Sequence, residues 1–97
     1  MKVRLTRQAR TDLREIREYH LRDYPATADQ IRGAIADAIR LLSLRPDVGP
    51  PNRHVPGLRS KLVLRYPYRI HYRVSGDVLI VLHVRHTARR DWTESAS

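Results

Sequence analysis

The spacing of apolar residues predicts two helices in the first half of the chain. Residues 2–5 alternate polar and apolar side chains, which is typical of a short strand, and the hydroxyl of Thr6 can cap a helix that follows. The stripe of that helix consists of Ala9, Leu13, Ile16 and His20. Because Pro25 disfavours helical geometry at the residue before it, the first helix is expected to end near Asp23 and a second to begin at Pro25.

The second predicted helix is more apolar than the first. Its main stripe consists of Ala28, Ile31, Ile35, Ala38 and Leu42. Ala36, Leu41 and Leu44 extend the apolar surface beyond that face. Its many alanines allow a neighbouring helix to approach closely, so we expect an antiparallel helix hairpin over about residues 6–44. Residues 45–57 contain too much proline and glycine for regular structure and predict a loop.

Over the second half of the chain the period of the pattern changes to two, which predicts strands. The alternating apolar residues, which we expect to face the helices, are Leu62, Leu64, Tyr68, Ile70, Tyr72, Val74, Ile80, Leu82 and Val84. Gly76 can adopt the positive φ of a tight hairpin turn, so residues 75–77 are expected to join two strands. Tyr68 and Tyr72 are expected to be core aromatics with hydroxyls at the rim.

These elements follow the order β-α-α-β-β-β, which predicts an α+β fold. In such a fold the N-terminal helix hairpin packs on one face of an antiparallel sheet. We expect a single domain over residues 1–97, with the sheet at about 58–86 and a tail at 87–97. The pattern does not predict the order of the strands within the sheet.

The same alternation would gather basic side chains on the face of the sheet that no helix covers. They are Lys61, Arg65, Arg69, His71, Arg73, His83 and Arg85, with no carboxylate expected among them. The whole chain carries 19 Lys and Arg against 10 Asp and Glu, a net charge of +9. Arginine dominates, and its planar guanidinium suits phosphates and carboxylates. The expected partner is therefore nucleic acid or an acidic protein, and a solvated face without a specific ligand is the alternative.

Composition excludes several kinds of site. The absence of cysteine excludes disulfides and suits a reducing cytosol, so a cytoplasmic location is expected. The longest apolar run, residues 78–82, is far too short to cross a bilayer, and the first residues lack the apolar block of a signal peptide. The five histidines show no metal-ligand spacing, so neither metal nor cofactor is expected. His20, on the helix stripe, is expected to be a partly buried, hydrogen-bonded histidine.

Several motifs together resemble the ParE/RelE superfamily of toxins from bacterial type II toxin–antitoxin systems. They are GLR (57–59), YPYRIHYRV (66–74), SGDV (75–78) and VLHVRHTAR (81–89). The closing pattern of His86, Ala88 and Arg89 is similar to the ParE-like branch. Each motif alone has little specificity, but in this order and in a chain of this length they form a fairly specific set. The resemblance covers nearly the whole chain, including the helix hairpin and the P-x-x-G sequence at residues 46–49.

The resemblance implies a partner and a target. The partner is a cognate acidic antitoxin, ParD-like, whose C-terminal segment wraps and neutralises the toxin in a hetero-oligomer. The surplus apolar residues Ala36, Leu41 and Leu44, together with the net charge of +9, suit an acidic amphipathic segment that folds on binding. ParE-like toxins are taken to inhibit DNA gyrase by binding, whereas RelE-like toxins cut messenger RNA on the ribosome.

Ribonuclease chemistry requires a general base, a cation for the phosphorane and a general acid. Lys61, Arg65, Arg73 and His83 could supply these groups. RelE-like nucleases, however, often carry a tyrosine after the last strand, whereas the last tyrosine here is Tyr72, and the predicted strands contain no glutamate. We therefore expect gyrase inhibition without enzymatic activity. A RelE-like, ribosome-dependent mRNA endonuclease is the first alternative, and a non-toxic basic nucleic-acid-binding module is the second.

The end of the chain is the candidate target-binding segment. His86, Arg89, Arg90 and Trp92 lie within seven residues, and such a density of Arg and Trp is typical of binding hot spots. The alternative for Trp92 is that it folds back and caps the core. The alternative for His86 is that it only ends the last strand and donates a hydrogen bond to a backbone carbonyl.

Overall fold

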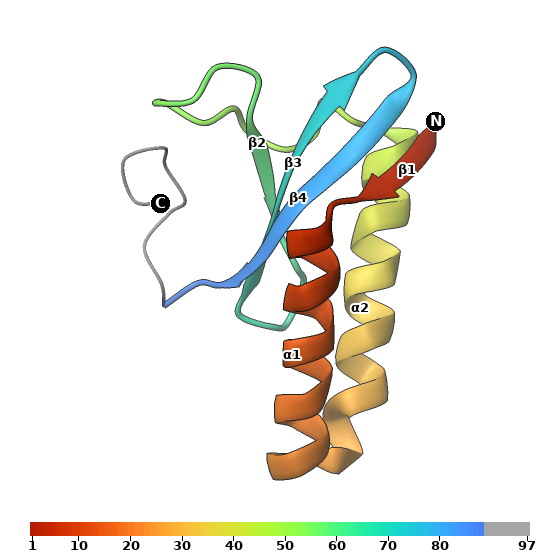
Figure 1. The fold of residues 1–97 in the computed structure, drawn as a ribbon, viewed down its shortest axis with the longest axis vertical. Coiled ribbons are helices and arrows are strands. Elements are labelled where there is room, and N and C mark those ends of the chain that lie inside the picture. Colours follow the sequence, from red (N-terminus) through yellow and green to blue (C-terminus); the bar gives the residue numbers. More distant parts are fainter. Residues whose placement is uncertain (89–97) are drawn as a thin grey trace.

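The computed structural model describes residues 1–88. Its elements are β1 (Lys2–Leu5), α1 (Arg7–Asp23), α2 (Pro25–Leu44), β2 (Arg59–Leu62), β3 (Tyr68–Ser75) and β4 (Val78–His86). The predicted order β-α-α-β-β-β is therefore confirmed. Figure 1 shows the two helices side by side on one side of the sheet, as expected for a helix hairpin.

The helix boundaries follow the local signals in the sequence. The hydroxyl of Thr6 accepts a hydrogen bond from the backbone N–H of Ala9 at 3.0 Å, which satisfies one free donor of the first turn of α1. Tyr24 ends α1, and Pro25 occupies the first turn of α2, where its missing N–H costs nothing. Both the N-cap and the break before Pro25 are as predicted.

The sheet has the strand order β1-β4-β3-β2. The β2–β3 and β3–β4 pairs are antiparallel, but β1 pairs with β4 in the parallel sense. The sheet is therefore mixed, whereas the sequence pattern predicted an antiparallel one. The difference arises because β1 precedes the helix hairpin, and its strand partner is the last strand of the chain rather than a neighbour in sequence.

A β-bulge in β4 changes which of its residues face the helices. The register places His71 opposite His83 and Tyr72 opposite Val81, so Leu82 is an extra residue without a partner on β3. The buried residues of β4 are consequently Leu79, Val81 and Val84. The prediction that Ile80 and Leu82 face the helices was wrong, because an inserted residue reverses the alternation on one side of it.

The expected orientation of β2 was also wrong. Val63 is buried, while Leu62 is 48% and Leu64 81% exposed. Leu62 lies opposite Arg69 on the face away from the helices, and β2 ends before Leu64. The alternation in this segment fits either phase, because apolar residues occupy three successive positions, 62–64.

The core lies between the hairpin and the covered face of β3 and β4. Its residues include Ala9, Ile31, Ile35 and Leu42 from the helices, and Tyr68, Ile70, Tyr72, Leu79, Val81 and Val84 from the strands. Tyr68 and Tyr72 are therefore core aromatics, as predicted. Each removes a large apolar area from water, which is the main favourable term in folding.

The hydroxyl of Tyr72 holds the loop between α2 and β2. It donates to the carbonyl of Pro46 at 2.7 Å and accepts from the N–H of Gly49 at 3.0 Å. A Cβ atom at Gly49 would lie 2.5 Å from this hydroxyl and from the carbonyl oxygen of Ser60, so only glycine fits there. Nη1 of Arg59 also donates to the carbonyl of Gly49 at 2.7 Å. A loop without helix or strand is thereby fixed to the sheet.

Candidate functional site

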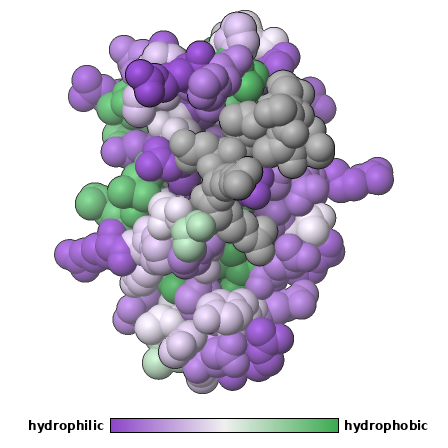
Figure 2. Space-filling model, turned by 90° about the vertical axis from the view of Figure 1, so that its left-hand side faces the viewer, coloured by the Kyte–Doolittle hydropathy of each residue, from purple (hydrophilic) through white to green (hydrophobic). Residues whose placement is uncertain are grey.

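The face of the sheet away from the helices is basic. Residues opposite each other in paired strands project to the same face, so the register identifies its members. We call this the basic face, and it comprises Lys2, Arg4, Arg69, His71, Arg73, His83 and Arg85. His71 was predicted here as an accessible basic group, but it is only 2% exposed. None of the strands contains Asp or Glu. Figure 2 presents the side of the molecule at the left of Figure 1, where hydrophilic residues predominate.

One cross-strand pair on the basic face is unfavourable for folding. Arg69 lies directly opposite Arg85, and like charges in this arrangement destabilise a sheet by a few tenths of a kcal/mol to about 1 kcal/mol. Nη1 of Arg69 donates to the hydroxyl of Ser60 at 3.2 Å, which fixes the side chain along the sheet. A face that tolerates such repulsion is better suited to an anionic partner than to stability alone.

Lys61 and Arg65 were expected on this face, and the structure places both elsewhere. Lys61 lies opposite Ile70, whose side chain is in the core, so Lys61 projects toward the helix side of the sheet. Arg65 lies in the turn after β2, with a φ of 74°. The error follows from the wrong phase assigned to β2. Arg4, by contrast, was not predicted for the face, because the partner strand of β1 could not be deduced from the sequence.

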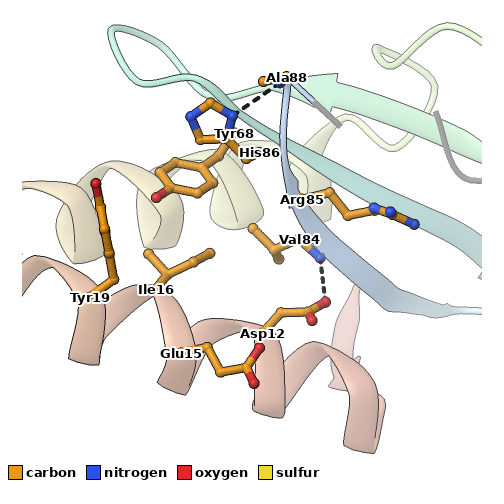
Figure 3. Close-up of a pocket in the computed structure, with 9 residues that line it drawn as sticks. All are labelled: Asp12, Glu15, Ile16, Tyr19, Tyr68, Val84, Arg85, His86 and Ala88. Atoms are coloured by element: carbon orange, nitrogen blue, oxygen red, sulfur yellow. Dashed lines mark hydrogen bonds between the residues drawn. The ribbon is translucent and has the colours of Figure 1, made fainter. Parts of the chain in front are cut away.

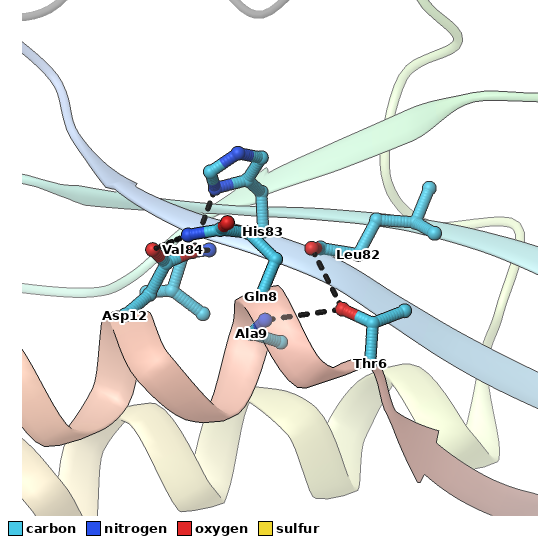
Figure 4. A network of polar contacts seen from close by, with 7 residues as sticks. All are labelled: Thr6, Gln8, Ala9, Asp12, Leu82, His83 and Val84. Carbon is cyan, nitrogen blue, oxygen red and sulfur yellow. Dashed lines mark hydrogen bonds and ion pairs between the residues drawn. The ribbon is translucent and has the colours of Figure 1, made fainter.

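His83 contacts a carboxylate that the sequence pattern did not predict. Its Nδ1 lies 2.6 Å from Oδ2 of Asp12, and the same oxygen accepts the backbone N–H of Val84 at 3.0 Å. Oδ1 of Asp12 accepts from the amide of Gln8 at 2.8 Å. Figure 4 shows Asp12 reaching from α1 to β4, so that both of its oxygens are engaged.

These contacts occur where β4 lacks a neighbouring strand. β1 pairs with β4 only as far as Val81, and α1 then runs past the open edge. Thr6 donates its backbone N–H to the carbonyl of Val81 at 3.1 Å. Figure 4 shows its hydroxyl donating to the carbonyl of Leu82, at 3.0 Å. Asp12 then satisfies Val84. A helix thus takes over the hydrogen bonds of a missing strand, which protects the edge from other pairing.

The sequence did contain a signal for Asp12. Asp12 lies three residues after Ala9 and four before Ile16, on the buried side of α1, and it is only 9% exposed. Carboxylates are almost never buried unless they are paired. An acidic residue within an apolar helical stripe therefore indicates a partner across the core.

A pocket of about 490 Å³ lies between α1 and the ends of β3 and β4. Its walls include Glu15, Tyr19, Tyr68, Arg85 and His86, and we call it the His86 pocket (Figure 3). The rings of Tyr68 and His86 meet edge to face, with centroids 5.5 Å apart. Nδ1 of His86 accepts the backbone N–H of Ala88 at 3.0 Å, so His86 supports the turn that ends β4.

Tyr68 links this pocket to α1. Its hydroxyl lies 3.0 Å from Nε2 of His20, and burial raises the pKa of the Tyr68 hydroxyl above its ordinary value, with the charge of Tyr19 adding to the effect. The hydroxyl therefore stays protonated at neutral pH. His20 is partly buried and hydrogen-bonded, as predicted.

Of the candidate target-binding residues, only His86 is described. It is exposed at the end of β4. Arg89, Arg90 and Trp92 lie outside the described residues, and their role stays a prediction.

The candidate antitoxin-binding residues separate into different surfaces. A groove of about 600 Å³ lies between the helices, with a floor of Leu13, Ile16, Ile31, Ile35 and Ile39. We call it the hairpin groove, and Ala36 lines it. A second groove, of about 660 Å³, lies between α2 and the end of β2 and is lined by Leu41, Lys61, Leu62, Leu64 and Arg65. Leu44 is 73% exposed and lines neither groove.

Residues 1–88 contain no candidate metal site, because no three side chains of His, Asp or Glu in this part of the chain lie close enough together to hold a metal ion. Neither helix is both long enough and apolar enough to cross a membrane.

The fold and the match to known families agree on the class of protein. A helix hairpin on one face of a mixed four-stranded sheet is the architecture of ParE/RelE toxins. Residues 3–91 match the family described as the ParE toxin of the type II toxin–antitoxin system parDE. The chain belongs to this family and is a type II toxin. No curated protein sequence is significantly similar to it.

Solved structures show the same relationship. The chromosomal ParDE system from P. aeruginosa is 25% identical, with a TM-score of 0.77 and coverage of 89% of this chain and 95% of the other. The YoeB/ParE toxin from Agrobacterium tumefaciens is 26% identical, with a TM-score of 0.63 and coverage of 89% and 98%. The RelBE2 toxin–antitoxin complex from Mycobacterium tuberculosis is 29% identical, with a TM-score of 0.60 and coverage of 88% and 95%.

Proposed function

We propose that this toxin inhibits DNA gyrase in the cytoplasm by binding it, without catalysis, and that a cognate acidic antitoxin neutralises it. Action without catalysis is supported by one observation: the four candidate ribonuclease residues do not lie together. Arg73 and His83 belong to the basic face, whereas Lys61 projects to the helix side and Arg65 lies in a turn. General acid, general base and cation must all reach one phosphate, within hydrogen-bond distance of the atoms they serve.

His83 by itself does not supply a ribonuclease site. Its Nδ1 faces the carboxylate of Asp12, which also holds the edge of β4, so Nε2 is the atom through which His83 would act as a general acid or base. Two of the other predicted groups, Lys61 and Arg65, do not lie on the same face, and this separation favours a toxin that acts by binding.

The basic face supports an anionic target. Lys2, Arg4, Arg69, Arg73 and Arg85 place five positive charges across three adjacent strands, with no carboxylate from those strands between them. Such a surface attracts anions over distances of about a Debye length, roughly 10 Å at ordinary ionic strength. DNA held by gyrase, or an acidic patch of the enzyme, has the required charge.

The antitoxin partner is supported by the family and by the charge. The P. aeruginosa structure is of a ParDE system and the M. tuberculosis structure is a toxin–antitoxin complex. The present chain has a net charge of +9 and apolar grooves beside α2. Co-expression with the adjacent small reading frame should give a complex that survives purification at low salt. Separate purification of the two proteins would contradict this part of the proposal.

The target is tested by two assays on the same purified toxin. We expect it to inhibit gyrase supercoiling and to leave ribosome-bound messenger RNA uncut. Lys61→Ala and Arg65→Ala should keep full inhibition, because neither residue lies on the basic face. Position-specific cleavage of translated messages that is lost in these two variants would instead identify a RelE-like endonuclease. Tight, steeply salt-dependent binding to naked DNA or RNA, without effect on gyrase, would indicate a non-toxic nucleic-acid-binding module.

A further inference from the structure

The His86 pocket lies where the end of β4 separates an aromatic surface from a cationic one. The rings of Tyr19, Tyr68 and His86 line the pocket. Figure 3 shows the side chain of Arg85 extending from β4 to the side away from the rings of Tyr19 and Tyr68, and the register places Arg85 on the basic face. An anionic chain whose phosphate lies near Arg85 would therefore have its next planar group beside the pocket.

We propose that the His86 pocket binds one unpaired guanine base of a DNA strand whose phosphates lie on the basic face. The inference rests on the proposed function and deepens it, because it identifies the anionic partner as DNA rather than an acidic patch of the gyrase protein. The pocket volume of about 490 Å³ lies within the roughly 300–1,000 Å³ typical of small-ligand sites. A base within a duplex is stacked and paired, so only an unpaired base can enter such a pocket.

The aromatic residues supply the part of base binding that does not depend on sequence. Tyr19 is 41% exposed and therefore accessible to a ligand. Tyr68 and His86 meet edge to face with centroids 5.5 Å apart, so each ring restricts the orientation of the other. Ile16 and Val84 add apolar side chains to the lining. Every base has a π face and stacks on such rings, so these residues account for affinity but not for selection.

Two polar groups of the pocket supply the selection. The side chain of Glu15 lines the pocket from α1 and forms no hydrogen bond or ion pair with any other residue of 1–88. His86 lines the pocket from β4, and its Nδ1 accepts the N–H of Ala88. The proton of the neutral His86 ring is therefore on Nε2, which is a donor. The pocket thus presents an acceptor from the helix and a donor from the strand.

Guanine is the base whose edges match this pair of groups. Its N1 and N2 carry adjacent N–H donors, which the carboxylate of Glu15 accepts together. Its O6 and N7 are acceptors for Nε2–H of His86. Adenine and cytosine each place an acceptor nitrogen beside their amino group, and that nitrogen repels a carboxylate. Thymine has a single N–H between two carbonyl groups, so it also lacks the paired donors.

The probe is a pentamer of thymidine in which guanine replaces the central base. The same strand with hypoxanthine or thymine at the centre is the control, and hypoxanthine lacks only the 2-amino group of guanine. Titration into methyl-labelled full-length toxin should shift Val84 and Ala88, which line the pocket, and leave Ile39 of the hairpin groove unchanged. The guanine strand should bind about tenfold more tightly than the thymine strand and about fivefold more tightly than the hypoxanthine strand.

Glu15→Gln tests the group that selects the base. Its amide NH₂ faces the N–H donors of guanine, so the preference for guanine over hypoxanthine should fall to about twofold or less. Glu18→Gln is the matched control, because Glu18 is exposed on the same helix and lines none of the three pockets described above. Both variants remove one negative charge and should raise the affinity for all three strands equally, but Glu18→Gln should keep the full preference.

Tyr19→Leu tests stacking. It should weaken binding of all three strands by at least about fivefold and leave their order unchanged, because stacking does not distinguish the bases. Tyr24→Leu is the matched control, since Tyr24 is a tyrosine that is 55% exposed near Tyr19 but lines none of these pockets. It should change the Kd about twofold or less.

Three results would overturn the inference. They are equal affinity for the three strands, a guanine preference that persists in Glu15→Gln, and binding that leaves Val84 and Ala88 unshifted. Each indicates attraction to the charge of the basic face alone. Gyrase supercoiling, measured with the same toxin, tests the proposed function separately. If the toxin inhibits gyrase but does not select guanine, only the inference is wrong. If it selects guanine but leaves gyrase active, the base site stands and the proposed function is wrong.

Discussion

The two faces of the sheet are built by the same strands but differ in burial and in charge. On the covered face Ile70, Tyr72, Leu79 and Val81 are 0% exposed, and their burial stabilises the fold. On the basic face the neighbouring residues include Arg73, which contributes little to packing and places charge where a partner can reach it. The period of two therefore places apolar side chains in the core and most of the basic side chains on the opposite face. Substitutions on the covered face should change the free energy of unfolding, and those on the basic face should change toxicity.

Asp12 belongs to neither face, because its carboxylate lies at the edge of the sheet between them. Its substitution tests whether a residue at this edge serves stability or toxicity. Asp12→Ala removes the acceptor of Val84 and the partners of His83 and Gln8. We expect it to lower the free energy of unfolding by about 3 kcal/mol, since a buried N–H and a histidine lose their partner. Urea denaturation measures this. Glu15→Ala, an exposed residue on the next turn of α1, is the control and should cost less than about 0.5 kcal/mol.

If Asp12→Ala keeps wild-type stability but loses toxicity, the contact between Asp12 and His83 does not stabilise the fold. His83 and Asp12 would then form a functional pair, and catalysis would regain support. Asp12→Asn sharpens the distinction, because it keeps an acceptor for the N–H of Val84 but removes the charge that faces His83.

Tyr72 is the covered-face residue whose polar atom also matters. Tyr72→Phe keeps the ring in the core but leaves the buried N–H of Gly49 without an acceptor. The expected loss is about 1–2 kcal/mol in the free energy of unfolding. Tyr66→Phe is the matched control, since the Tyr66 hydroxyl donates only to Gln30, at 3.3 Å and near the surface, and its loss should cost about 0.5 kcal/mol or less.

The pH dependence of the same residue has a definite sign. Burial raises the pKa of the Tyr72 hydroxyl above the ordinary value of 10.0. The contribution of this neutral hydroxyl to stability is complete below pH 10, and it decreases as the pH rises through the raised pKa of the folded state. Wild type should therefore lose more stability than Tyr72→Phe between pH 9 and about pH 11. An equal loss in both proteins would contradict the assignment.

The local signals of the sequence predicted most of the covered face correctly. The cap at Thr6, the break before Pro25 and the buried tyrosines depend on a few neighbouring residues. The parallel pairing of β1 with β4 depends on contacts across more than 70 residues, and the bulge at Leu82 depends on how β4 pairs with β3. Patterns within one strand carry no information about such contacts.

The candidate site was predicted less completely for the same reason. Arg69, Arg73 and Arg85 were assigned to the correct face because the alternation of β3 and of the end of β4 is regular. Lys61 was misplaced because residues 62–64 are all apolar and their alternation fits both phases. Asp12 joined the site through a helix far away in sequence.

Arg73 tests the basic face directly. Arg73→Glu should change the free energy of unfolding by about 0.5 kcal/mol or less, because the side chain is exposed and forms no buried contact. Toxicity in a growth assay should fall sharply, since the variant reverses a positive charge on the basic face, where we expect an anionic target to bind. Arg53→Glu, exposed in the loop before β2, makes the same change in net charge and should stay toxic. Equal effects from both variants would show that only net charge matters.

The smallest expected change in stability concerns the end of the chain. His86 is the last residue of β4, and the backbone N–H of Thr87 still donates to the carbonyl of Pro67 at 2.7 Å. Arg89, Arg90 and Trp92 follow in the sequence. We therefore expect Arg89→Ala and Trp92→Ala to abolish most toxicity while antitoxin binding and the melting temperature change little, because Arg and Trp dominate binding hot spots. If Trp92 instead packed on the core, its truncation would cost about 3–5 kcal/mol, a large part of the roughly 5–15 kcal/mol available to a domain. Thermal unfolding distinguishes the two cases, and full toxicity in both variants would remove this segment from the site and leave recognition to the basic face alone.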